Sequence, residues 1–233
     1  MWVRALSVAK AGGESDENED RVAVSSDRFA VADGVGQSAR SEVWAQLLVD
    51  SFVVRRESPL VPKTLLALQD QWRQLVEVPD LAWYASDKLR ECGGAATFVG
   101  LSVDVGERRL AVEAVGDSCF YQFRGGDIVA GGPLTDWRAF GSHTVAVQTL
   151  PYEDTAMDAN CWRFSGAYEG GDTAVLATDA VALYLLRYED RREELLSLVA
   201  GEEYEVEFER WVTQEREAGR LRDDDTTICV IVP

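Results

Sequence analysis

The stretch FAVADGVG, residues 29–36, places Asp33 and Gly34 directly after a short apolar run. Such a run is typical of a buried β-strand, and Asp-Gly is typical of the turn that ends one. A carboxylate at the end of a buried strand is held on a rigid part of the fold. Asp33 is therefore the first candidate for a functional residue.

Three further aspartates have the same local setting. Asp20 precedes a short apolar run at residues 21–25, Asp179 follows AVLAT, and Asp224 precedes TTICVIV, which ends at residue 232. One aspartate in such a place is usually a turn residue, whereas four suggest a shared purpose.

Carboxylates that a fold brings together repel one another, and each raises the pKa of its neighbours. A hard divalent cation relieves that repulsion, and oxygen ligands suit Mg²⁺ or Mn²⁺. The residues alone leave two interpretations open, which are a metal site and a set of solvated turns.

The composition narrows the possible functions. The chain has 233 residues, which is enough for one domain with a sizeable core, and we expect a single domain over residues 1–233. Its 41 acidic and 23 basic residues give a net charge of −18, which disfavours nucleic acids and anionic membranes as partners. The sequence shows neither a secretory signal nor a membrane-spanning run, so we expect a cytoplasmic protein.

The usual catalytic side chains are scarce. His143 is the one histidine, and its apolar, strand-like surroundings favour a structural role. The spacing of the four cysteines suits neither zinc nor a disulfide framework, which favours free thiols in a reducing compartment. Carboxylates remain as the main chemical resource.

The order of the predicted elements indicates the fold class. Strands come first, then helices, many strands, more helices and a last strand, without a regular βα alternation. This order favours an α+β fold in which helices cover antiparallel sheets. Apolar periodicity predicts helices over residues 39–54, 63–78, 80–92, 181–187, 191–199 and 204–217, and strands over residues 21–25, 28–32, 95–103, 109–115, 119–123, 144–149, 173–177 and 226–232.

Six short strings occur in one order along nearly the whole chain, and together they resemble the metal-dependent protein phosphatases of type 2C, the PPM family, in its short bacterial branch. The resemblance implies an αββα sandwich, in which two antiparallel sheets lie face to face between helices, with a two-metal site at one end. The strings are NED at 18–20, VADGVG at 31–36, GAAT at 94–97, VGDS at 115–118, LATD at 176–179 and DDTT at 224–227.

The resemblance also implies roles for single residues. Asp33 matches the aspartate that bridges both ions, and Gly34 matches the glycine that offers its carbonyl. Asp179 and Asp224 match the other two acidic ligands, and these three aspartates would hold the metal-activated water. Asp20 matches the acidic position of the first motif, a role that Glu19 could share. Asp117 matches the position that helps to hold a third ion in some bacterial members.

The sequence departs from the family pattern at three positions. Many members carry a phosphate-binding arginine where this chain has Ser15, and Arg21 or Arg40 are the candidates to replace it. Val35 stands where eukaryotic relatives have a histidine, and Ala180 stands where glycine is usual. A protein without the arginine would bind phosphate mainly through its ions, which predicts a higher KM.

The resemblance implies an enzyme that removes phosphate from phosphoserine and phosphothreonine through two Mg²⁺ or Mn²⁺ ions. Its partner would be a phosphorylated protein, either a separate Ser/Thr kinase or a target of one, and we expect a monomer. The departures keep open a catalytically weak pseudophosphatase that binds a phosphoprotein or a kinase. A scaffold with acidic turns is the third alternative.

Overall fold

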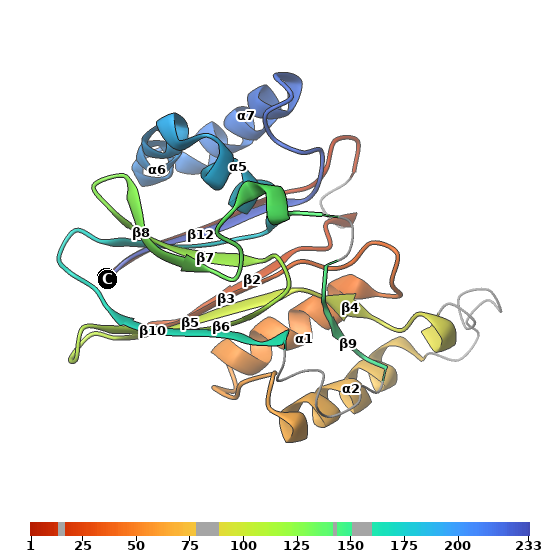
Figure 1. The fold of residues 1–233 in the computed structure, drawn as a ribbon. Coiled ribbons are helices and arrows are strands. Elements are labelled where there is room, and N and C mark those ends of the chain that lie inside the picture. The colour runs from red at the N-terminus through yellow and green to blue at the C-terminus, as the bar shows by residue number, and fades with distance from the viewer. Residues whose placement is uncertain (14–16, 78–88, 142–143, 151–159) are drawn as a thin grey trace.

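The computed structural model describes residues 1–13, 17–77, 89–141, 144–150 and 160–233. Two five-stranded antiparallel sheets lie face to face, and helices cover the outer face of each (Figure 1). The α+β class and the αββα sandwich are confirmed.

The first sheet has the strand order β1-β12-β11-β7-β8. Its two terminal strands are neighbours, because Trp2 of β1 pairs with Val232 of β12 and Val8 pairs with Thr226. The strands of this sheet are β1 (Trp2–Val8), β7 (Cys119–Arg124), β8 (Asp127–Gly132), β11 (Thr173–Ala177) and β12 (Thr226–Val232).

The second sheet has the order β10-β6-β5-β3-β2. Its strands are β2 (Arg21–Val24), β3 (Arg28–Ala32), β5 (Phe98–Asp104), β6 (Arg109–Val115) and β10 (Trp162–Ala167). A separate two-stranded sheet joins β4 (Ala95–Ala96) to β9 (Val147–Gln148).

Helices close both outer faces of the sandwich. In Figure 1 the orange helices α1 (Ser41–Val53) and α2 (Pro62–Val76) lie below the second sheet. The blue helices α5 (Asp179–Arg187), α6 (Arg192–Ala200) and α7 (Tyr204–Glu217) lie above the first sheet. None of the helices in the described ranges has the length and apolar character needed to span a membrane.

Burial on both faces explains why the central strands read as continuous apolar runs. In β3, Phe29 and Val31 pack in the layer between the two sheets, whereas Ala30 and Ala32 pack against α1. All four side chains are fully buried. Successive side chains of a strand point to opposite faces, so each central strand serves two cores at once.

The structure also contains strands that the sequence analysis did not predict, namely β1, β8 and β10. All three lie at the edges of their sheets, where side chains are only partly buried and the apolar pattern is weak. The strand predicted over residues 144–149 is shorter, because only Val147–Gln148 pair with β4. Most of the helix predicted over residues 80–92 lies outside the described residues.

Candidate functional site

The predicted aspartates of the second sheet lie at one end of a single strand pair. Asp20 immediately precedes β2, and Asp33 immediately follows β3. Arg21 pairs with Ala32 in antiparallel register, so the two carboxylate-bearing residues flank the same end of the pair.

The other aspartates reach this end of the sandwich from the first sheet and from a connecting turn. Asp179 lies two residues after β11, and Asp224 lies two residues before β12. These strands are also antiparallel, with Ala177 opposite Ile228. Asp117 lies in the turn between β6 and β7, which passes from one sheet to the other.

Asp33 occupies the electrostatic centre of this group. The pKa of its carboxyl is raised well above the usual value, first by burial and then by the charges of Asp20, Asp179, Asp117 and Asp224. The structure therefore brings together the five aspartates that the sequence analysis singled out. We call these five residues the acidic cluster.

Asp20 is 4% exposed and is oriented by its neighbours. Its Oδ2 atom accepts a hydrogen bond of 3.0 Å from Thr178 Oγ1, and its backbone N–H donates to Asn18 Oδ1 at 2.8 Å. Burial is the largest cause that raises the pKa of Asp20 to about 8, and the charges of Asp225 and Asp179 add to it. The carboxyl is thus held in place and is poorly stabilised as an anion.

Asp179 begins α5 and is 9% exposed. Burial raises its pKa to about 6, and the charges of Asp117 and Asp224 act in the same direction. Its Oδ2 atom accepts a hydrogen bond of 2.8 Å from Arg222 Nη1. This arginine opposes the shift but does not cancel it.

Asp117 and Asp224 complete the cluster at the side of the turns. Asp117 Oδ2 accepts a hydrogen bond of 2.7 Å from Thr144 Oγ1, and burial raises the pKa of its carboxyl. Asp224 is exposed, and its Oδ1 atom accepts the backbone N–H of Asp225 at 2.9 Å. One member of the cluster therefore faces solvent while Asp20, Asp117 and Asp179 are buried.

Gly34 lies where the chain passes too closely for a side chain. A Cβ atom at this position would lie 2.9 Å from the carbonyl oxygen of Glu19 and 2.9 Å from Cβ of Ser41. Next to it, the carbonyl of Asp33 accepts the N–H of Thr97 at 2.8 Å, and Val35 N–H donates to Ala95 O at 2.9 Å. The turn that carries Asp33 is thus fixed on both sides.

Glu19 and Asp20 have different surroundings. Ser41 Oγ donates a short hydrogen bond to Glu19 Oε1, and Lys10 Nζ lies 3.6 Å from Glu19 Oε2. By contrast, the charge of Asp20 raises the pKa of Asp33 more than that of any other residue does. The geometry favours Asp20 over Glu19 as the acidic group of the first motif that belongs to the cluster.

Asp225, which the sequence pattern did not indicate as a site residue, connects the N-terminal loop to the start of β12. Its two carboxylate oxygens accept the backbone N–H groups of Lys10 at 2.8 Å and of Glu19 at 2.7 Å. Its position directly after Asp224 is the only sequence signal for it. Asp225 holds the residues around Asp20 against the start of β12.

Two buried oxygens test whether the cluster suits a cation. Within the described ranges, Oδ1 of Asp20 and Oδ1 of Asp179 are buried and accept no hydrogen bond. Buried polar atoms are rarely left without a partner, so these oxygens have free capacity for a ligand. Hard oxygen donors and excess negative charge fit Mg²⁺ or Mn²⁺.

The carboxylates do not form a ready-made coordination shell. Across the described part of the chain, no three His, Cys, Asp or Glu side chains lie close enough together to hold a metal ion. The cluster therefore has the donor type and the charge that a divalent cation needs, and the assignment of metal ligands stays a prediction.

The two arginines that the sequence proposed for phosphate binding are both engaged elsewhere. Arg21 Nη1 donates to the carbonyl oxygens of Asn18 at 2.6 Å and of Asp20 at 2.7 Å. Arg40 is exposed, and its Nε atom donates to Glu42 Oε1 at 2.7 Å. Ser15 and His143 lie outside the described residues.

Arg222 is a functional candidate that the sequence analysis missed. Besides its bond to Asp179, its Nη2 atom donates to the carbonyl of Phe140 at 3.4 Å. Its charge also lowers the pKa of Asp117, so the guanidinium lies beside two members of the cluster. Arg222 lies two residues before Asp224 in the sequence. This position indicates a role at the site only when the ends of β11 and β12 are known to lie together.

Comparison with solved structures relates this geometry to known proteins. The serine/threonine phosphatase PstP/Ppp of Mycobacterium tuberculosis is 18% identical, with a TM-score of 0.63 over 98% of this chain and 97% of that one. The PPM Ser-Thr phosphatase MsPP of Mycobacterium smegmatis is 15% identical, with a TM-score of 0.57 over 99% of this chain and 97% of that one.

This chain has the fold of the PPM-type serine/threonine phosphatases. A further solved structure with this fold is the catalytic domain of PstP in complex with two manganese ions, which is 18% identical with a TM-score of 0.61 over 98% of this chain and 96% of that one. No family model matches the sequence, and no curated protein matches it. At these identities the PPM-type likeness is one of fold.

Proposed function

We propose that this protein is a metal-dependent serine/threonine protein phosphatase that hydrolyses phosphoserine and phosphothreonine on a partner protein. The observation that carries the proposal is the acidic cluster, in which four carboxylates surround Asp33 and two buried oxygens have no partner. A PPM-type fold around this cluster supports the assignment. The partner would be a separate Ser/Thr kinase or one of its targets.

The chain's own residues supply binding and orientation. Asp33, Asp179 and Asp224 would hold two divalent cations, with Asp20, the Gly34 carbonyl and Asp117 as further donors. When bound, such cations lower the pKa of a water molecule and offset the negative charge of a phosphate ester. The side chains of Thr178 and Thr144 fix the orientation of Asp20 and Asp117.

Electrostatics explain why the cluster is costly for the protein without a cation. Burial and mutual repulsion raise the pKa values of Asp20 and Asp179 to about 8 and about 6, so their ionised forms are disfavoured. A cation would reverse that penalty and would also let a phosphate approach a chain of net charge −18.

The direct test is hydrolysis of phosphothreonine peptides with Mn²⁺, with Mg²⁺ and with EDTA, beside the Asp33→Asn variant. We expect turnover with either cation, none in EDTA, and little in the variant. Full activity in EDTA would contradict the mechanism. The same assays should include thermal melts, because a bound cation stabilises the fold by mass action.

A pseudophosphatase is the second candidate, and the ion pair between Arg222 and Asp179 favours it. This pair, at 2.8 Å, places an internal cation on a proposed metal ligand. A protein whose melting temperature rises with Mn²⁺ but which hydrolyses neither peptides nor p-nitrophenyl phosphate would support this candidate. A protein whose melting temperature ignores Mn²⁺ would contradict both.

A further inference from the structure

A second feature lies next to the acidic cluster and carries the opposite charge. A hollow of about 350 Å³ lies between α5, the short helix η2 (Trp137–Ala139) and the loop before β12. Four of the residues that line it are arginines and none is acidic, although the chain carries 41 acidic residues. We call this hollow the arginine groove, after Arg138, Arg187, Arg220 and Arg222.

The groove begins at the acidic cluster and follows α5 away from it. Arg222 contacts Asp179, the first residue of α5, and Arg187 is the last residue of that helix. Eight rises of about 1.5 Å separate the two ends, so Arg187 lies about 12 Å along the helix axis from Asp179. An anion bound by Arg187 would therefore sit at a defined distance from the cluster.

Arg187 is the arginine that is best placed to take a new partner. It is exposed, and no carboxylate in the described residues pairs with it. Its guanidinium lies 5.0 Å from the ring centre of Trp137 and 5.4 Å from that of Tyr188. Stacking on aromatic rings holds an arginine in position without satisfying its N–H donors.

The other arginines of the groove already have partners. Arg220 donates two hydrogen bonds to Glu215, at 2.5 and 2.6 Å. Arg138 pairs with Asp136 at 3.3 Å, which is an exposed contact of little strength. Arg220 thus contributes to the positive wall of the groove, while Arg187 and Arg138 can turn toward a ligand.

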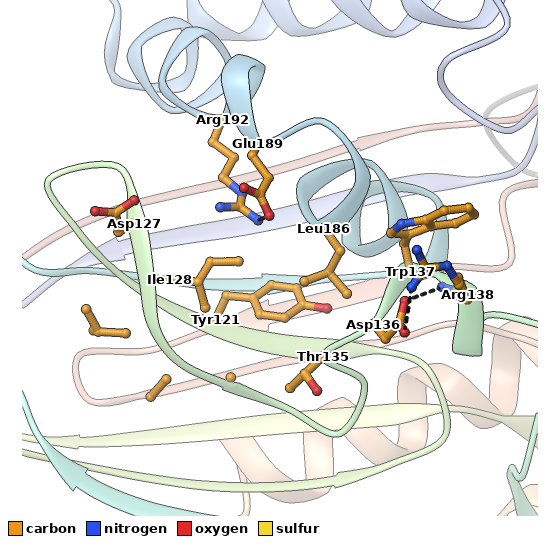
Figure 2. Close-up of a pocket in the computed structure, with 13 residues that line it drawn as sticks. Tyr121, Asp127, Ile128, Thr135, Asp136, Trp137, Arg138, Leu186, Glu189 and Arg192 are labelled. Atoms are coloured by element: carbon orange, nitrogen blue, oxygen red, sulfur yellow. Dashed lines mark hydrogen bonds and ion pairs between the residues drawn. The ribbon is translucent and has the colours of Figure 1, made fainter.

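A larger hollow of about 760 Å³ is also lined by Trp137 and Arg138, but it does not share the positive character of the groove. Figure 2 shows Asp127, Asp136 and Glu189 among its lining residues, together with Arg138 and Arg192. Arg192 donates to the carbonyl of Leu185 at 2.6 Å and is 8% exposed. Its three carboxylates make this hollow a poorer site for an anion than the arginine groove.

We propose that the arginine groove binds an acidic side chain of the phosphoprotein substrate, three or four residues away from the phosphorylated residue. An extended peptide advances about 3.3 Å per residue, so about 12 Å corresponds to this separation. Arginine binds carboxylates through two parallel N–H donors, which suits Asp or Glu. The inference rests on the proposed function, because it places the phosphorylated residue at the acidic cluster.

The charge of the rest of the protein favours a short acidic segment over a long polyanion. The net charge of −18 would repel a nucleic acid that extended beyond the groove. A peptide with one or two carboxylates can use Arg187 and Arg138 without placing further negative charge against the rest of the acidic surface.

The experiment compares phosphothreonine peptides that carry a single Glu three or four residues before or after the phosphorylated residue with a peptide that has Ala there. A sixth peptide, with Glu eight residues away from the phosphorylated residue, places its carboxylate beyond the reach of the groove. We expect kcat/KM to be about two- to tenfold higher for a Glu within reach, which corresponds to one favourable and partly exposed ion pair. The preference should shrink in high salt.

Arg187→Gln should abolish the preference, and Arg187→Lys should keep part of it. The matched control is Arg108→Gln, because Arg108 is also exposed and lies 5.8 Å from the ring centre of Tyr168, but it stands in the hairpin at the far end of β6. That control should keep the full preference. Equal kcat/KM for all peptides, or a preference that survives Arg187→Gln, would overturn the proposal.

Peptide binding separates this proposal from the proposed function. Fluorescence anisotropy with labelled peptides needs no turnover, and it can use the Asp33→Asn variant. The protein could show no hydrolysis and still bind the Glu peptide more tightly than the Ala peptide through Arg187. That result would support the groove as a binding site and contradict the phosphatase assignment. An oligonucleotide that displaces the Glu peptide more effectively than the unlabelled peptide does would contradict the groove as a peptide site.

Discussion

Strand β11 has a buried aspartate near each end, and the two carboxylates differ in how many hydrogen bonds they accept. At its start, Asp172 is 2% exposed and accepts hydrogen bonds from Arg124, from Gln122 at 2.7 Å and from the N–H of Glu169 at 2.8 Å. Beyond its other end, Asp179 accepts one bond from Arg222, and its Oδ1 atom accepts none within the described residues.

The pKa values of the two carboxyls record this difference. The Arg124 guanidinium lowers the pKa of Asp172 well below its usual range, whereas burial raises that of Asp179 to about 6. Burial alone therefore does not mark a functional acid. What distinguishes Asp179 is acceptor capacity that the protein leaves unused, and this is a property of a binding site.

The largest expected effect is on turnover, and it should appear for substitutions in the acidic cluster and not for those at the start of β11. Asp33→Asn should lower turnover by about 10²-fold or more, because Asp33 lies at the centre of the charges that would hold the ions. Asp172→Asn, the matched change at the other end of β11, should leave turnover within a few-fold when assayed below its melting temperature. Steady-state kinetics on a phosphothreonine peptide measures both. Near-normal turnover in Asp33→Asn would remove the central role of that residue.

Thermal stability should instead depend more on Asp172 than on the acidic cluster. Asp172→Asn should destabilise the fold by about 1–3 kcal/mol, because it leaves buried donors without their charged acceptor. Asp179→Asn should leave the metal-free protein as stable or make it more stable, since it removes a carboxylate whose ionised form is disfavoured. Melts in EDTA compare the two variants. Equal losses of stability would show that the two ends do not differ.

The last expected effect is the pH dependence of stability between about pH 4 and pH 8. The folded-state pKa values of Asp20 and Asp179 are raised to about 8 and about 6, so these groups bind protons more tightly when folded. Their contribution therefore lowers the stability of the metal-free protein as pH rises through this window. Asp172 has a lowered pKa, so its contribution is complete above pH 4 and is lost only as pH falls further.

Melting temperatures in EDTA across this window test the sign. The wild-type protein should lose stability with rising pH, the loss should be smaller in Asp33→Asn, and saturating Mn²⁺ should reduce it in the wild type. A wild-type slope that neither the substitution nor Mn²⁺ changes would mean that the acidic cluster does not cause it.

Local pattern predicted the buried parts of the fold well. The helix over residues 204–217 and the strand over residues 226–232 were predicted with the bounds that the structure has, as α7 and β12. Helix α7 has one buried face and therefore a helical apolar period, whereas β12 is buried on both faces and reads as a continuous apolar run. The edge strand β1 was missed, because Arg4 and Ser7 interrupt its apolar pattern and its pairing partner lies more than two hundred residues away.

The sequence by itself determined the acidic character of the site. Each aspartate follows or precedes an apolar run, and this local signal requires no knowledge of pairing. Order along the chain and resemblance to type 2C phosphatases then supplied the expected fold. That Glu19 pairs with Ser41 and Lys10, while the charge of Asp20 raises the pKa of Asp33, was decided by the tertiary structure, because adjacent side chains at a strand end have different neighbours.

Only the tertiary structure could decide where the positive charge lies. Arg138, Arg187, Arg220 and Arg222 are scattered among 23 basic residues, and nothing in their local sequence separates them from the others. They meet because α5, η2 and the loop before β12 pack beside one another, and the contact between Arg222 and Asp179 joins them to the acidic cluster. Local sequence specifies which charge a residue carries, whereas long-range packing specifies which charges become neighbours.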